Sequence, residues 1–131
     1  MKMIKIRQYI SELLELVHPD VEIDGEKHPR VHFQHADDDS IYPFLVFDLP
    51  NSYDDGSMEN FVLEIDGWDN KSDTIPLETL MGEVDKELHR HTVVFDDVGM
   101  TFYRENRLSL TDPDTRLRRR KYVYQIRVHG E

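Results

Sequence analysis

The sequence predicts a single α+β domain spanning residues 1–131, with a roughly four-stranded antiparallel sheet and two amphipathic helices packed on one face. Two observations carry this prediction. Two segments repeat apolar residues at helical spacing, and several others alternate or run apolar over strand length. The order is helix, strands, helix, strands, which is typical of α+β architecture. A chain of 131 residues with 38% hydrophobic residues can bury one core.

The first helix is predicted over residues 3–17, and His18-Pro19 ends it because the residue before a proline disfavours helical backbone. A polar connection follows, in which Asp24-Gly25 is a turn signal. Short extended pieces are expected at Val21–Ile23 and at 30–33. The apolar stripe of this helix is Met3, Ile6, Ile10, Leu13, Leu14 and Val17.

A hairpin is predicted in the middle of the chain. Residues 41–49 form a near-continuous apolar run, and residues 60–68 alternate between apolar and acidic side chains. The Asn, Asp, Gly and Ser residues of 51–57 separate these runs and read as the turn.

The second helix is predicted to begin after Asp73 or Thr74, either of which can cap it, with Pro76 in its first turn. We expect Gly82 to let this helix approach the sheet closely. Trp68, at the end of the preceding strand, is expected to pack against it. The apolar stripe is Leu77, Leu80, Met81, Val84 and Leu88.

The last quarter of the chain predicts two more strands. Residues 93–95 and 100–104 read as one strand broken at 96–99, and a loop is expected from 105 to 117. The final strand, 118–129, alternates most clearly. The open face of the sheet is expected to carry Glu64, Asp66, Lys121, Gln125 and Arg127.

Composition narrows the function classes. The net charge is −11, yet residues 101–131 hold eight Arg or Lys against four Asp or Glu, so the acidic excess lies in the rest of the chain. An acidic body argues against general nucleic-acid binding and favours association through complementary surfaces. The absence of cysteine excludes disulfides, zinc–thiolate sites and cysteine nucleophiles. With no long apolar run and no signal-like start, we expect no membrane partner and a reducing compartment.

Metal and catalytic patterns are weak. His28, His32 and His35 precede Asp37-Asp38-Asp39, but residues four apart on an extended chain lie about 13 Å apart. A polar surface loop is therefore favoured over a metal site. Residues 66–73 lack the ligand spacing of a calcium loop. Adjacent carboxylates such as Asp96-Asp97 have no nucleophile motif beside them, so we expect no catalytic residue, cofactor or metal.

The basic run Arg116–Lys121 enters an alternating strand, which splits its charge between two faces. It is interpreted either as a charged edge strand that resists unwanted pairing or as a contact surface for an acidic patch on a neighbouring subunit. The second interpretation is favoured. Residues 37–39 and Asp54-Asp55 are the acidic candidates.

The order of these elements resembles the tail-completion, or tail-terminator, proteins of long-tailed bacteriophages and prophages, from about residue 3 to 129. The resemblance rests on a proline-led strand, Tyr42–Phe47, on Phe61–Asp69 leading into a helix, and on Asp112–Thr115 before a basic alternating strand. It implies a small α+β domain that is not an enzyme. It further implies a monomer in solution that assembles as a hexameric ring on the tail tube, stops tube polymerisation and joins the head connector in the virion.

The resemblance carries over regions of the chain: the basic strand and the hairpin loop. Together with the charged open face they give the expected partner-binding residues: Arg118, Arg119, Arg120, Lys121, Arg127, Asp54, Asp55, Glu64 and Asp66. Two other functions remain open. One is a head-completion or connector adaptor protein, and the other is a metal-dependent hydrolase that uses the three histidines with the aspartates.

Overall fold

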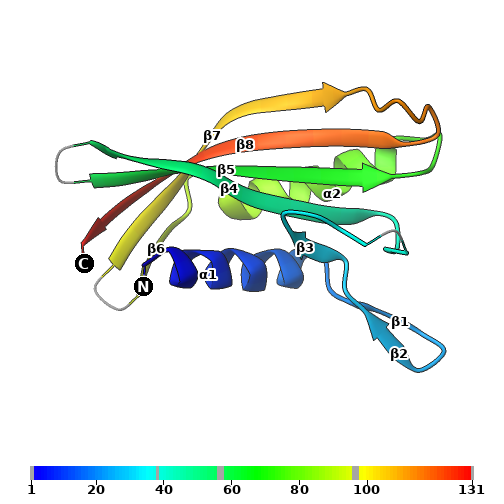
Figure 1. Ribbon diagram of the computed structural model, residues 1–131, viewed down its shortest axis with the longest axis horizontal. Helices are drawn as coiled ribbons and strands as arrows, with labels where there is room; N and C mark the ends of the chain where they lie inside the picture. The colour runs from blue at the N-terminus through cyan, green and yellow to red at the C-terminus, as the bar shows by residue number, and fades with distance from the viewer. Residues whose placement is uncertain (1, 38, 56–57, 96–97, 131) are drawn as a thin grey trace.

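The computed structural model describes residues 2–37, 39–55, 58–95 and 98–130 (Figure 1). Helix α1 (Lys2–Val17) is followed by a small two-stranded sheet, β1 (Val21–Ile23) and β2 (Glu26–His28), and by β3 (Val31–Phe33). Then come β4 (Phe44–Asp55), β5 (Met58–Asp69), helix α2 (Ile75–Leu88), β6 (Thr92–Phe95), β7 (Val98–Leu110) and β8 (Arg118–Gly130).

The main sheet has six strands in the order β3-β4-β5-β8-β7-β6, so the predicted four-stranded antiparallel sheet is wrong. Strand β3 pairs parallel to β4, and every other neighbouring pair is antiparallel. The parallel pairing of β3 with β4 could not be predicted from hydrophobic periodicity, because β3 is only three residues long. A long loop returns the chain from β3 to the start of β4.

Two segments that the sequence predicts to be turn or loop form β-strand in the structure. Residues 51–55, expected in a turn, continue β4 after a register shift between Asp48 and Asn51. Pro50, which has no N–H to donate, lies within that shift. Residues 105–110, expected in a loop, continue β7 past a second shift between Arg104 and Asn106. Both extensions form because a neighbouring strand supplies backbone partners, which outweighs polar local sequence.

The segment predicted as one broken strand is instead an antiparallel hairpin of β6 and β7, in which Phe95 pairs with Val98. Residues 96–97, including the Asp96-Asp97 pair, and Asp38 lie outside the described residues.

One hydrophobic core joins both helices to the sheet. Ile6, Ile10 and Leu14 of α1 are fully buried, as is most of the predicted α2 stripe. Met3, predicted in the α1 stripe, is instead 36% exposed. Asp73 Oδ1 accepts a hydrogen bond from the Ile75 amide, which supports the predicted start of α2.

A strand glycine lies where side chains of α2 come close to the sheet. A Cβ on Gly67 of β5 would lie 2.6 Å from Met81 Sδ and 3.0 Å from Leu77 Cδ1. A Cβ on Gly82 would meet nothing within 4 Å, so the role expected of Gly82 is wrong. Because successive strand residues point to opposite faces, Trp68 lies on the face away from α2, where it stacks on Phe44.

Candidate assembly surfaces

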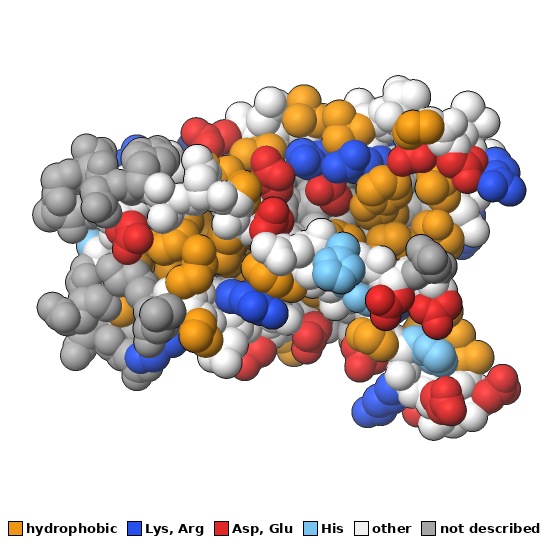
Figure 2. Space-filling view, in the orientation of Figure 1, with side chains coloured by type: hydrophobic (Ala, Val, Ile, Leu, Met, Phe, Trp, Pro, Cys, Tyr) orange, Lys and Arg blue, Asp and Glu red, His pale blue; other side chains and the backbone are white. Residues whose placement is uncertain are grey.

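The face of the sheet away from α2, the open face, carries paired charges along β5 and β8. Arg119 Nε donates to Asp66 Oδ1 at 2.9 Å, and Lys121 Nζ lies 3.2 Å from Glu64 Oε1 and 3.8 Å from Asp66 Oδ2. In Figure 2 basic and acidic side chains form a stripe with hydrophobic surface beside it. The structure therefore brings four predicted partner-binding residues together, and their charges largely cancel within one chain.

The basic run does not lie on an edge strand. Strand β8 pairs with β5 on one side and β7 on the other, so the edge interpretation is wrong. Arg118 Nη1 donates to the Thr115 carbonyl at 2.8 Å, and Arg120 Nη2 lies 3.3 Å from Glu78 Oε1 on α2. The alternation thus splits the run as predicted: Arg119 faces the open side and Arg120 faces α2.

The remaining predicted residues lie apart from this stripe. Arg127 is exposed, and its guanidinium lies 5.4 Å from the centre of the Tyr103 ring, a cation–π arrangement. The backbones of Asp54 and Asp55 belong to β4, opposite Glu59 and Met58. The side chains of both aspartates lie outside the described part of the chain.

A hollow of about 390 Å³ opens beside the charged stripe, and sequence reasoning missed it. Phe44 and Trp68 are cross-strand partners, and their rings stack with centres 6.4 Å apart. The Arg119 guanidinium lies 4.9 Å from the centre of the Trp68 ring. The lining also includes Gln34, His35, Ala36, Asp37, Tyr42, Val46, Asp66 and Leu117. The sequence signal that could have indicated this hollow is the pair of aromatic residues Phe44 and Trp68, at the start of β4 and near the end of β5.

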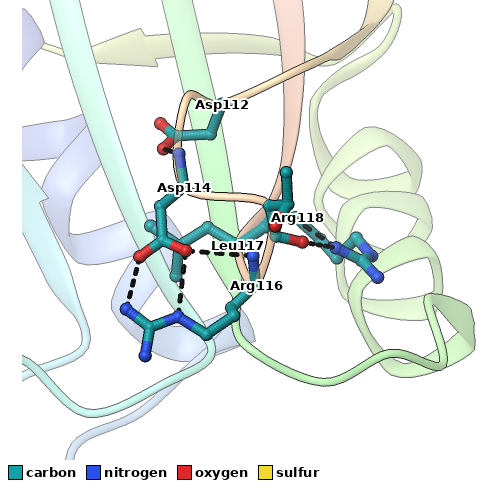
Figure 3. Close-up of polar contacts among 6 residues, drawn as sticks. Asp112, Asp114, Arg116, Leu117 and Arg118 are labelled. Atoms are coloured by element: carbon teal, nitrogen blue, oxygen red, sulfur yellow. Dashed lines mark hydrogen bonds and ion pairs between the residues drawn. The ribbon is translucent and has the colours of Figure 1, made fainter.

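The loop before β8 is ordered by its own side chains (Figure 3). Asp112 Oδ1 accepts a hydrogen bond from the Asp114 amide at 2.9 Å. Asp114 in turn accepts from the Arg116 amide and Nε at 3.0 Å and from Nη2 at 2.9 Å. Hydrogen bonds from Arg116 hold the pKa of the Asp114 carboxyl down to about 2. The predicted turn therefore presents a preformed, charged surface loop.

The three histidines of the hydrolase hypothesis do not form a metal site. His28 belongs to β2 and His32 to β3. Within residues 2–37, 39–55, 58–95 and 98–130, no three His, Cys, Asp or Glu side chains are placed to hold one metal ion. Burial lowers the pKa of His32.

Helices long and apolar enough to cross a membrane are absent from the described residues.

Comparisons with known proteins bear on the fold. No protein-family model matches the chain, and no curated protein matches it. The chain is similar in structure to a chain in the virion of native gene transfer agent (GTA) particle, with a TM-score of 0.64 and 12% sequence identity. The match covers 90% of this chain and 85% of that chain. At this identity the comparison establishes a shared fold over nearly the whole domain.

Proposed function

We propose that this protein is a structural component of a phage or prophage virion that caps the tail tube, stops its polymerisation and joins the tail to the head connector. The single observation that carries the proposal is the fold shared with a chain of a virion, which extends over 90% of this chain. The order of sequence elements, which resembles that of tail-completion proteins, points to the tail end of the particle.

The partners in this proposal are other copies of the chain in a six-membered ring, the tail tube protein and the head connector protein. The work is done by surface contacts, without catalysis, cofactor or metal. Two features support contact surfaces. The Asp112–Arg116 loop is held in shape by its own hydrogen bonds, so little ordering is needed on binding. The open face presents aromatic rings beside ion pairs whose charges cancel, and such a surface can be covered without leaving an unpaired charge.

The test is electron microscopy of particles made by a phage or prophage that lacks this gene. Overlong or ragged tails unattached to filled heads are expected, and the wild-type gene supplied in trans should restore normal particles. A second complementation should use Lys86→Ala, an exposed change on α2 that serves as a folded control.

Tails of normal length would overturn the capping role. Heads that are then unjoined or leak DNA would identify a head-completion or connector adaptor instead. Intact particles with normal tails would overturn both virion roles.

A further inference from the structure

The small sheet of β1 and β2 stands out from the body of the molecule as an arm, residues Val21–His28 (Figure 1). Every residue of the arm is exposed or half-buried. The arm follows α1 and directly precedes β3, which is one outer strand of the main sheet.

The arm has features that fix its shape. Its two-residue turn places Asp24 at φ 53° and Gly25 at φ 81°, the backbone that favours Asp-Gly in a tight hairpin. At its base, Arg30 Nε and Nη2 both donate to the Pro19 carbonyl, at 3.0 and 2.9 Å. An isolated two-stranded hairpin is only marginally stable in water, so a contact that covers the arm would stabilise it.

The chemistry of the arm defines what it can contact. The acidic side chains of Glu22, Asp24 and Glu26 are exposed. Lys27 in β2 is the lysine of the arm, and it is exposed as well. Ile23 is 40% exposed, an apolar side chain among carboxylates. A matching surface therefore needs cationic groups beside apolar ones.

Such a surface lies on β7 and β8. A hollow of about 220 Å³ is lined by Arg107, Leu108, Ser109, Arg120, Tyr122 and Glu78, and we name it the β7–β8 pocket. Arg107 is exposed. Arg120 Nε is buried with no hydrogen-bond partner among the described residues, while its Nη2 lies 3.3 Å from Oε1 of Glu78, the acidic residue of the lining. On the face toward α2, the pocket thus combines the Arg107 and Arg120 guanidinium groups with the Tyr122 ring. Leu108, the cross-strand partner of Lys121, points to the open face.

Strand β3, which directly follows the arm, forms one edge of the main sheet, and the register aligns it with the part of β7 that lines the pocket. His32 of β3 pairs with Val46, Val46 with Asp66, Asp66 with Lys121, and Lys121 with Leu108. Strand β6 pairs only with residues 98–101 of β7, so it does not cover the part of β7 that lines the pocket. Two copies placed side by side can therefore bring the arm of one to the pocket of the next.

We propose that the β1–β2 arm of one copy docks in the β7–β8 pocket of a second copy of this chain. The acidic side chains meet Arg107 and Arg120, the latter beside its own ion pair with Glu78, and Ile23 covers the Tyr122 ring. Because the two surfaces differ, the contact is head-to-tail, and it builds a ring when the repeated rotation completes a full turn. This inference rests on the ring in the proposed function, and it does not depend on where in a virion that ring sits.

The natural absence of cysteine permits a direct cross-linking test. The double variant Ile23→Cys, Ser109→Cys leaves the charged groups of arm and pocket in place, and both positions are accessible. Particles assembled with this variant, in which the ring is proposed to form, are oxidised and resolved on non-reducing gels. Head-to-tail docking yields a ladder of covalent multimers beyond the dimer. The matched control is Ile23→Cys with Ser52→Cys, an exposed serine near the far end of β4.

Charge reversal sharpens the test. Adding Glu22→Lys and Glu26→Lys, or Arg107→Glu, to the cross-linking variant should reduce the yield of multimers at least 10-fold. Combining the arm and pocket reversals should restore much of it, because the pairing is then inverted rather than lost.

A ladder equally strong with Ser52→Cys, or no product beyond the dimer, would overturn the docking. Circular dichroism of each variant confirms that it is folded. The gene-deletion phenotype is read separately. If the deletion gives overlong tails and the cross-linking gives no ladder, the capping role stands and the docking is overturned. If the cross-linking gives a ladder and the deletion leaves tails of normal length, the docking stands and the capping role is overturned.

Discussion

The two faces of strand β5 differ although their residues alternate along one segment of chain. Leu63 and Ile65 are fully buried under the helices, whereas Glu64 and Asp66 are half-buried and ion-paired across to β8. Burial of apolar area stabilises the fold, while ion pairs that remain in contact with water contribute about 0–1 kcal/mol each. The face under the helices, the covered face, therefore supplies most of the stability of the fold, and we expect substitutions on the open face to cost less.

The largest effect is expected on the covered face. Ile65→Ala removes a fully buried side chain and should lower the free energy of unfolding by about 2–5 kcal/mol. Urea unfolding followed by circular dichroism measures it. Glu64→Ala, the neighbouring residue on the open face, is the matched control. Equal losses from the two variants would break the comparison between the faces.

The second largest effect on stability is expected at Asp85, a polar residue on the α2 side of the sheet. Asp85 of α2 accepts a hydrogen bond from the Tyr124 hydroxyl at 2.7 Å and pairs with Arg104. Asp85→Ala leaves the buried Tyr124 hydroxyl without this acceptor, which should cost about 1–3 kcal/mol. Asp85→Asn keeps an acceptor oxygen and should cost less. Denaturant unfolding of both variants gives the difference, and equal losses would contradict the assigned role of the hydrogen bond.

A smaller effect is expected on the open face. Asp66→Asn removes the charge that pairs with Arg119 and Lys121, and the loss should be at most about 1 kcal/mol. It should shrink further in 0.5 M salt, because partly exposed pairs are screened. A loss that exceeds that of Asp85→Ala would mean that this face also holds the fold.

Burial of His18 makes the stability of the protein depend on pH. Burial is the largest cause that lowers the pKa of His18, and the Arg30 charge adds to it against a hydrogen bond with the Pro43 carbonyl. Below the ordinary pKa of about 6.5, the unfolded chain binds a proton that the folded chain resists. Stability should therefore fall as the pH drops from 7.5 to 5.5. His18→Gln should reduce this fall in urea midpoints, and an unchanged slope would contradict it.

The smallest effect on stability is expected in the loop before β8, where the carboxylate is exposed. The Asp114 carboxyl should titrate with a pKa of about 2, against an ordinary value of 3.8, because Arg116 donates hydrogen bonds to it. Carbon-detected NMR across pH 1–6 measures this value. In Arg116→Gln the pKa should return toward 3.8. An unchanged low value would assign the shift to another group.

Much of the fold could be predicted from the sequence. Both helices and the alternating strands at 60–68 and 118–129 lie where their apolar periodicity predicts, because one face of each is buried. The strand extensions at 51–55 and 105–110 could not be predicted, since their polar residues become strand only when a neighbouring strand supplies hydrogen-bond partners.

The surfaces were predicted in part. Alternation alone placed Glu64, Asp66, Lys121 and Arg127 among the residues of the open face. It did not reveal that Asp66 and Arg119 pair within one chain, or that Phe44 and Trp68 line a hollow. Those contacts depend on the register between strands that are far apart in the sequence.

Apolar periodicity in the sequence is sufficient to predict most of the residues that α1, α2, β5 and β8 bury, because it reflects one-sided burial whichever element lies beside them. The strand order, the parallel β3–β4 pair and the interior place of β8 follow from the tertiary structure alone. Backbone pairing between distant segments sets these features, and backbone hydrogen-bonding groups are nearly the same in every residue. The side-chain pattern of a single strand therefore does not specify which strand lies beside it.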